Sequence, residues 1–149
     1  MNAITCSGLV KEYRTQKLVR ALDDVSFDVV EGEVFGLLGP NGAGKTTTLR
    51  MMGGVLVPTE GSVTIDGLNI AREPEKAKKR IGFIPDRPFL YEKLTGMEFL
   101  RFTADLYGVA DGLFREKSEE ILKKFLLDDW GDELIESYSH GMKQRLIVS

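Results

Sequence analysis

The sequence has few of the features that mark extracellular or membrane-embedded proteins. It contains one cysteine, Cys6, so no disulfide can form within the chain, and this fits a reducing compartment. No apolar run approaches the ~20 residues that a membrane-spanning helix needs. Residues 1–7 lack the charged and apolar regions of a signal peptide. Lysine and arginine form no long block and the net charge is −3, so we expect a cytoplasmic protein without a nucleic-acid partner.

The remaining composition is that of a globular domain. Of the 149 residues, 42% are hydrophobic and 29% are charged, and the length fits one domain. Internal repeats and low-complexity tracts are absent from the sequence. Function must therefore be sought in local motifs.

The most informative stretch is the glycine-rich segment Gly39–Thr47, whose sequence is GPNGAGKTT. It fits the phosphate-binding loop pattern G-x-x-x-x-G-K-[ST]. Glycines let backbone N–H groups approach phosphate oxygens, and the following helix N-terminus adds further donors. We expect Lys45 to reach the β- and γ-phosphates and the Thr46 hydroxyl to ligate Mg²⁺. The context agrees, because an apolar run at Val34–Leu38 predicts a buried strand and Thr46–Leu56 predicts a helix.

The rest of the chain divides into a strand-rich part and a helical part. Alternation and short apolar runs predict further strands at residues 4–13, Val25–Val29, Ser62–Ile65 and Ile81–Ile84, with a short helix at Glu73–Arg80. Beyond a loop at 85–94 only helical signals appear, beginning with the capping box Thr95–Glu98. A second helix has an apolar face with charged residues outside it, and a third begins at Gly141. The apolar face of the second helix consists of Phe114, Ser118, Ile121, Leu122 and Phe125.

A second motif lies at Tyr138–Arg145, with the sequence YSHGMKQR. A small polar residue and a glycine at a helix start present a hydroxyl, N–H groups and a positive dipole end, which suit an anion. An ordinary serine N-cap explains Ser139 equally well, and the motif alone does not decide between the two.

Four segments together carry a family resemblance: Ala21–Phe27, Gly39–Thr47, Pro58–Ser62 and Tyr138–Arg145. From about Leu9 to Ser149 the sequence resembles the ATP-binding cassette (ABC) family, the nucleotide-binding subunits of membrane transporters, and in particular bacterial cassettes, often of exporters. The resemblance implies an α/β fold of the P-loop NTPase type. It also implies one cassette with a strand-rich P-loop core at 1–85 and a helical subdomain at 86–149 that carries the signature motif.

The resemblance implies roles for individual residues. Tyr13 stands where the family stacks an aromatic ring on adenine, and Lys45 and Asp86 stand at catalytic positions. Ser139 and Gly141 match the signature, which in the family covers the γ-phosphate bound to a partner, so that ATP joins two cassettes head to tail. Transmembrane subunits would face the 85–94 loop, which places the protein on the inner face of the membrane. ATP and Mg²⁺ are the implied cofactors, and the phosphate loop residues are Asn41, Gly42, Ala43, Gly44, Lys45, Thr46 and Thr47.

The sequence departs from the family pattern at four points. Asp86 replaces a glutamine; it can ligate a cation but cannot donate a hydrogen bond when ionised, and it can equally be a turn residue beside Pro85. His140 replaces a glycine of the signature and is the sole histidine, so the family's switch histidine is missing. The catalytic Asp–Glu pair is missing too. We therefore expect an incomplete cassette, an ATP hydrolase at full length but inactive or nearly so as these 149 residues.

Two other functions compete with transport. An ABC ATPase acting in translation or DNA repair usually carries coiled-coil insertions or a tandem cassette, and neither occurs in this sequence. A P-loop kinase or GTPase is less consistent, because the sequence lacks an Asn-Lys-x-Asp guanine-reading segment and Tyr138–Arg145 would have no purpose.

Overall fold

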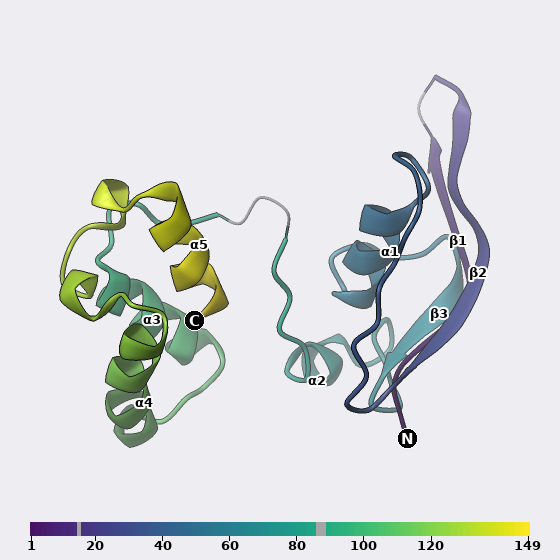
Figure 1. The fold of residues 1–149 in the computed structure, drawn as a ribbon. Helices are drawn as coiled ribbons and strands as arrows, with labels where there is room; N and C mark the ends of the chain where they lie inside the picture. Colours follow the sequence, from purple (N-terminus) through teal and green to yellow (C-terminus); the bar gives the residue numbers. More distant parts are fainter. Residues whose placement is uncertain (15, 86–88) are drawn as a thin grey trace. The chain divides into compact units, whose positions relative to one another are not determined.

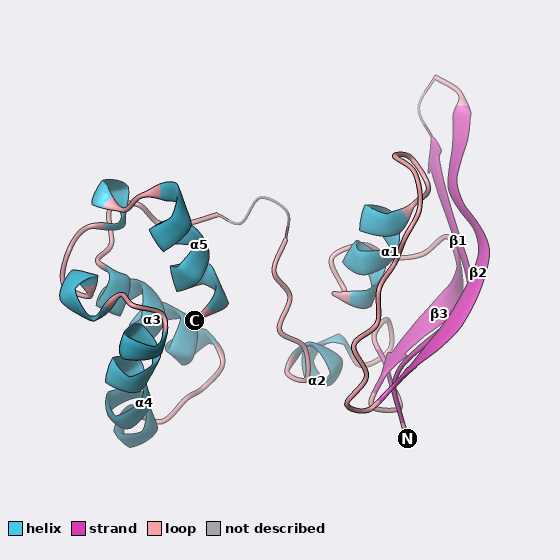
Figure 2. Ribbon diagram, viewed as in Figure 1, coloured by secondary structure: helices cyan, strands magenta, loops and turns pink. Residues whose placement is uncertain are grey.

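The computed structural model describes residues 1–14, 16–85 and 89–149. They form two compact units, Met1–Phe83 and Ile84–Ser149 (Figure 1). The first unit contains the sheet and the glycine-rich loop Gly39–Thr47, and the second is helical (Figure 2). The predicted α/β class is confirmed.

The first unit is built on an antiparallel sheet with the strand order β2-β1-β3-β4. Strands β1 and β2 form a long hairpin, and β3 pairs with the other edge of β1, so that Cys6 lies opposite both Phe27 and Val63. These strands confirm the expectations for residues 4–13, Val25–Val29 and Ser62–Ile65. The strand bounds are β1 Asn2–Arg14, β2 Leu18–Val30, β3 Glu60–Ile65 and β4 Leu68–Asn69.

Helix α1, Lys45–Met52, packs on one face of this sheet (Figure 2). Its Met51 is fully buried and shares a core with Cys6 and Val63. The helix is shorter than the expected Thr46–Leu56, because Gly54 adopts the left-handed conformation (φ +65°) that ends helices. The short helix α2, Pro74–Lys78, lies within the expected Glu73–Arg80 and buries Ala77.

Two predicted strands are wrong. Val34–Leu38 and Ile81–Ile84 belong to no strand of the described sheet, and Val34 and Leu38 are almost completely exposed. Both runs are apolar without alternation, which is typical of strands covered on both faces and flanked by neighbours. Within residues 1–14, 16–85 and 89–149 neither run has a neighbouring strand to pair with. Within the Val34–Leu38 run, Leu37 is half-buried, and the ring of Phe35, which is 39% exposed, stacks on that of Phe27 with the centroids 5.0 Å apart.

The described residues of the second unit form three α-helices, and two short 3₁₀ turns lie between the second and the third. The apolar face predicted for the second helix is confirmed, since Ser118 and Leu122 are buried and Phe114, Ile121 and Phe125 are half-buried. The capping box is confirmed as well, because the Thr95 and Glu98 side chains each accept a hydrogen bond from the other residue's backbone. Among the described residues, no helix is both long and apolar enough to cross a membrane. The elements are α3 Gly96–Leu106, α4 Asp111–Lys124, η1 Asp128–Trp130, η2 Ile135–Ser137 and α5 His140–Val148.

Candidate functional site

The glycine-rich loop forms one open site at the N-terminus of α1. A cavity of about 340 Å³ lies there, within reach of the first turn of the helix. The backbone N–H groups of that turn have no partner within the helix, so this end carries partial positive charge. The described residues that line the cavity are Ala21, Asn41, Gly42, Gly44, Lys45, Thr46 and Thr47. The structure therefore brings together six of the seven predicted loop residues; Ala43 lies in the same loop but does not line the cavity.

Lys45 closes the loop on itself. Its Nζ donates hydrogen bonds to the carbonyl oxygens of Gly39 at 2.6 Å and Pro40 at 2.8 Å. The ammonium group thus lies against the start of the loop and places a full positive charge beside the cavity. A second link, from Thr48 Oγ1 to the Gly44 carbonyl at 3.0 Å, fastens the loop to the helix.

Gly44, the residue directly before α1, lies so close to β2 that it leaves no room for a side chain. Its φ is +86°, a conformation that side chains disfavour. A Cβ there would lie 2.7 Å from Leu22 Cδ1 and 2.8 Å from the Ala21 carbonyl oxygen. The site is therefore shaped by β2 as well as by the loop, and a side chain at Gly44 would fill the cradle.

The residues around the loop fit a nucleoside triphosphate with a divalent cation. The donor set consists of backbone N–H groups, one ammonium and the exposed Thr46 hydroxyl, and it suits phosphate oxygens. Among the described residues no group of three or more His, Cys, Asp or Glu side chains could hold a metal. Mg²⁺ commonly takes one or two protein ligands and completes its shell with phosphates and water. Thr46 can supply such a ligand; Asp86 lies outside the described residues.

Tyr13 lies near the end of β1, opposite Val19 on β2. The residue is 38% exposed, and Lys11 Nζ lies 5.4 Å from the ring centroid. Tyr13 is not among the described residues that line the loop cavity. An exposed ring face is what a stacked base needs, so the adenine role stays a prediction.

The second motif forms the N-terminal turn of α5. Ser139 is the N-cap, and its Oγ accepts a hydrogen bond from the Met142 N–H at 3.3 Å. Ser139, His140 and Gly141 are all exposed. The capping interpretation of Ser139 is thus correct, and it is compatible with anion binding because the turn remains open to a partner.

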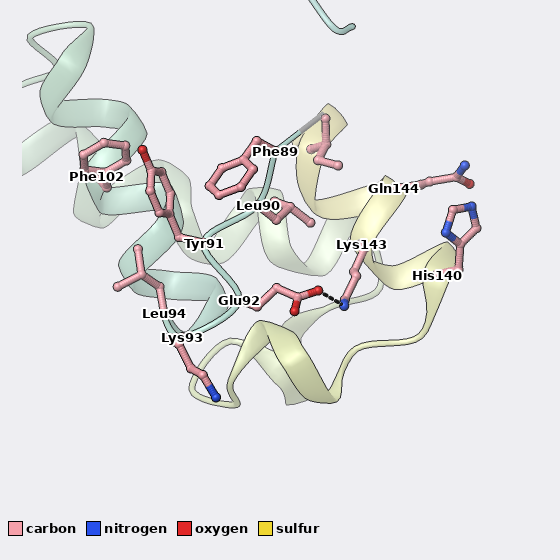
Figure 3. A pocket seen from close by; sticks show the side chains of 11 residues that line it. Phe89, Leu90, Tyr91, Glu92, Lys93, Leu94, Phe102, His140, Lys143 and Gln144 are labelled. Carbon is pink, nitrogen blue, oxygen red and sulfur yellow. Dashed lines mark hydrogen bonds and ion pairs between the residues drawn. The ribbon is translucent and has the colours of Figure 1, made fainter. Parts of the chain in front are cut away.

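A larger cavity of about 930 Å³ lies within the second unit (Figure 3). Its lining is mostly apolar, with the aromatic rings of Phe89, Tyr91 and Phe102 on one side and α5 on the other. Phe89 is 78% exposed, which is unusual for such a large apolar side chain.

Sequence reasoning missed several residues that shape these sites. Ala21 lines the loop cavity from β2, which is distant in sequence from the motif, and Thr48, directly after the motif, donates its hydroxyl hydrogen bond to the Gly44 carbonyl. Tyr138 and Lys143 belong to the predicted motif, but the hydrogen bond of Tyr138 to Trp130 and the ion pair of Lys143 with Glu92 were not predicted. The two ion-pair partners are 51 residues apart, so local sequence patterns carry no signal for their contact.

Comparison with known proteins gives a consistent result. The model of the ABC transporter family matches residues 22–149. The linearmycin resistance ATP-binding protein LnrL of Bacillus subtilis (strain 168) is 37% identical over 145 residues, which make up 97% of this chain and 46% of that protein. The chain thus spans about half the length of this relative.

Solved structures agree. The structure of an ATP-binding subunit of an ABC transporter matches 98% of this chain and 60% of its own, with a TM-score of 0.87 and 34% identity. A dimeric ATP-binding cassette in a post-hydrolysis state, bound to ADP and Pi, matches 97% of this chain and 67% of its own, with a TM-score of 0.85 and 26% identity.

Proposed function

Because the chain belongs to the ABC transporter family, we propose that it is the ATP-binding part of a subunit that couples ATP binding and hydrolysis to transport across a membrane. The observation that carries this proposal is the cradle at the N-terminus of α1, where backbone donors, Lys45 and Thr46 surround one open cavity. Residues 1–85 form its P-loop core and 86–149 its helical, signature-bearing part. The structure divides into compact units after Phe83, close to this boundary in the sequence, which supports the division.

In this function the loop binds the phosphates of ATP. Lys45 exchanges its bonds with the Gly39 and Pro40 carbonyls for phosphate oxygens, and its charge stabilises the negative charge that moves during phosphoryl transfer. Thr46 supplies one ligand to Mg²⁺, and Asp86 is a candidate for a second. Tyr13 offers its exposed ring to adenine.

The exposed turn at Ser139–Gly141 acts on a second copy of the chain. Its open N–H groups and the positive end of α5 suit a phosphate bound in another copy's loop. A similar cassette is dimeric and bound to ADP and Pi in its solved structure, which supports the pairing of two copies.

The membrane partner binds the apolar cavity of the second unit. Exposed aromatic groups rimmed by the charges of Glu92, Lys93 and Lys143 suit an amphipathic segment of a transmembrane subunit. The chain then works at the inner face of the membrane. Export is the favoured direction, since the similar LnrL protein is named for linearmycin resistance.

The first test is the binding of ATP with Mg²⁺ to the chain and to Lys45→Ala, measured by titration calorimetry. Binding that Lys45→Ala abolishes supports the proposal, and equal binding contradicts it. Affinity capture from membranes then separates the leading function from the runner-up. Recovery of an integral membrane protein supports transport, whereas recovery of ribosomes or DNA supports an ABC ATPase of translation or repair.

A further inference from the structure

The residue directly before the signature turn is a buried anchor. Tyr138 is only 4% exposed, and its hydroxyl donates a hydrogen bond to the carbonyl oxygen of Trp130. The Tyr138 and Trp130 rings also meet edge to face, with centroids 5.9 Å apart. A Cβ on Gly96, at the start of α3, would collide with the Tyr138 hydroxyl. The position of Tyr138 is therefore fixed by α3 and by the segment after α4.

Lys143, the second residue after the turn, is held as well, by a different segment. Lys143 points from α5 toward Glu92, and its Nζ lies 2.5 Å from Glu92 Oε1 (Figure 3). The backbone carbonyl of Glu92 accepts a hydrogen bond from the Glu136 N–H at 3.0 Å. Glu92 thus connects the 89–94 segment both to η2, which precedes the turn, and to α5, which follows it.

The charge of Lys143 needs a partner at this place. A lysine near a helix N-terminus is repelled by the positive end of the helix dipole. The first turn of α5, His140–Met142, contains no acidic residue that could compensate it. The Lys143 side chain is only 24% exposed, so solvent screens it in part, and Glu92 supplies the missing negative charge. The hydrogen bond and charge of Lys143 in turn lower the pKa of Glu92 below its ordinary value.

We propose that Tyr138 and the Glu92–Lys143 ion pair are positioning groups that together hold Ser139–Gly141 in the orientation in which the turn contacts the nucleotide of a second copy. This inference rests on the proposed function. Ser139 and Gly141 are exposed and have little packing of their own, so their direction depends on the fixed residues on either side. Binding groups need placement to within about 0.5 Å, and an exposed turn keeps that precision only through such supports.

Charge exchange tests the ion pair. The variants are Glu92→Lys, Lys143→Glu and the double variant that restores the pair with reversed signs. Lys117→Glu is the matched control, because it breaks an ion pair with Glu120 that lies entirely on α4. Hydrogen exchange at the Met142 and Lys143 amides reports the turn directly, since these N–H groups bond to the Ser139 Oγ and carbonyl oxygen.

Glu92→Lys is expected to speed this exchange roughly two- to fivefold, the range of a partly exposed ion pair. Lys143→Glu is expected to speed it less, because the helix dipole favours the new negative charge while Glu92 repels it. Each is also expected to weaken ATP-dependent association of two copies by a similar factor while ATP affinity stays unchanged. The double variant recovers most of both losses, and Lys117→Glu changes neither. Unchanged exchange in the single variants, or no recovery in the double variant, would overturn the role of the pair.

Tyr138→Phe tests the other support, because it keeps the buried ring and removes the hydrogen bond to Trp130. Tyr107→Phe is the control, since Tyr107 is exposed at the end of α3. Tyr138→Phe is expected to speed exchange at Met142 and weaken association with ATP affinity retained, and an effect equal to that of Tyr107→Phe would contradict the proposal. If the wild-type chain binds ATP but two copies never associate, the proposed contact between copies is wrong. The hydrogen-exchange measurements then still decide whether Tyr138 and the ion pair hold the turn.

Discussion

Replacing Gly44 with alanine tests how far the phosphate-binding loop depends on the shape of one residue. An alanine at φ +86° costs roughly 1–2 kcal/mol, which corresponds to a loss of about 5- to 30-fold in affinity if the loop must leave its bound shape. The new Cβ would also lie 2.8 Å from the Ala21 carbonyl oxygen, which β2 holds in place. Because this overlap adds to the conformational cost, Gly44→Ala is expected to lose more than about 30-fold in affinity for ATP with Mg²⁺.

Two other glycines separate the causes. Gly42 has φ +87° and open space where a Cβ would stand, so Gly42→Ala is expected to lose only the roughly 5- to 30-fold of the conformational cost. Gly67, between β3 and β4, has φ +77° and open space, so Gly67→Ala should lower the free energy of unfolding without changing ATP affinity. Titration calorimetry with a slowly hydrolysed ATP analogue measures binding, and urea unfolding measures stability. Equal affinities of Gly44→Ala and Gly42→Ala would refute the steric reasoning.

Three further outcomes are expected. Tyr13→Ala should weaken ATP binding by about 1–3 kcal/mol and leave inorganic triphosphate binding unchanged, because only adenine stacks; equal losses for both ligands would argue against the stack. Thr95→Ala should lower the unfolding free energy by about 0.5–2 kcal/mol in urea titrations, whereas Thr95→Ser, which keeps the capping oxygen, should change it little. Burial raises the pKa of the Cys6 thiol to about 11. Stability should therefore stay level below about pH 8.5 and fall as the pH rises toward 11, since the unfolded chain releases this proton first. Native Cys6 should also resist alkylation at about pH 8 and react after unfolding; equal rates in both states would contradict its burial.

Much of the fold was predictable wherever the signal is local. The alternation of Val25–Val29 and Ser62–Ile65 predicts strands because one face of each contacts the core. Thr95 and Glu98 predict the start of α3, since the hydrogen bonds of a capping box involve residues three apart. The GPNGAGKTT sequence of residues 39–47 likewise predicts a loop and helix start that require only a few consecutive residues.

The sequence was less informative where structure depends on distant partners. The apolar runs Val34–Leu38 and Ile81–Ile84 have strand-like composition, yet a strand forms only when another strand supplies hydrogen bonds. The support of the signature turn by Glu92 depends on a contact 51 residues away, and no spacing rule predicts it. Thr48 was missed for another reason, because its hydroxyl bonds the Gly44 carbonyl in a way that any helical threonine can.

In the proposed function, the loop of one copy and the signature turn of another form a single site. Mixing two variants tests it: Lys45→Ala, with a defective loop and an intact turn, and Gly141→Asp, with an intact loop and a turn that repels phosphate. In a dimer of either variant alone, each of the two sites contains one defective half. Neither variant should therefore self-associate in sedimentation velocity experiments with ATP and Mg²⁺ present. Mixed, they form one fully intact site, and association should return. Wild-type copies that associate while the mixture stays as monomeric as the separate variants would contradict the claim.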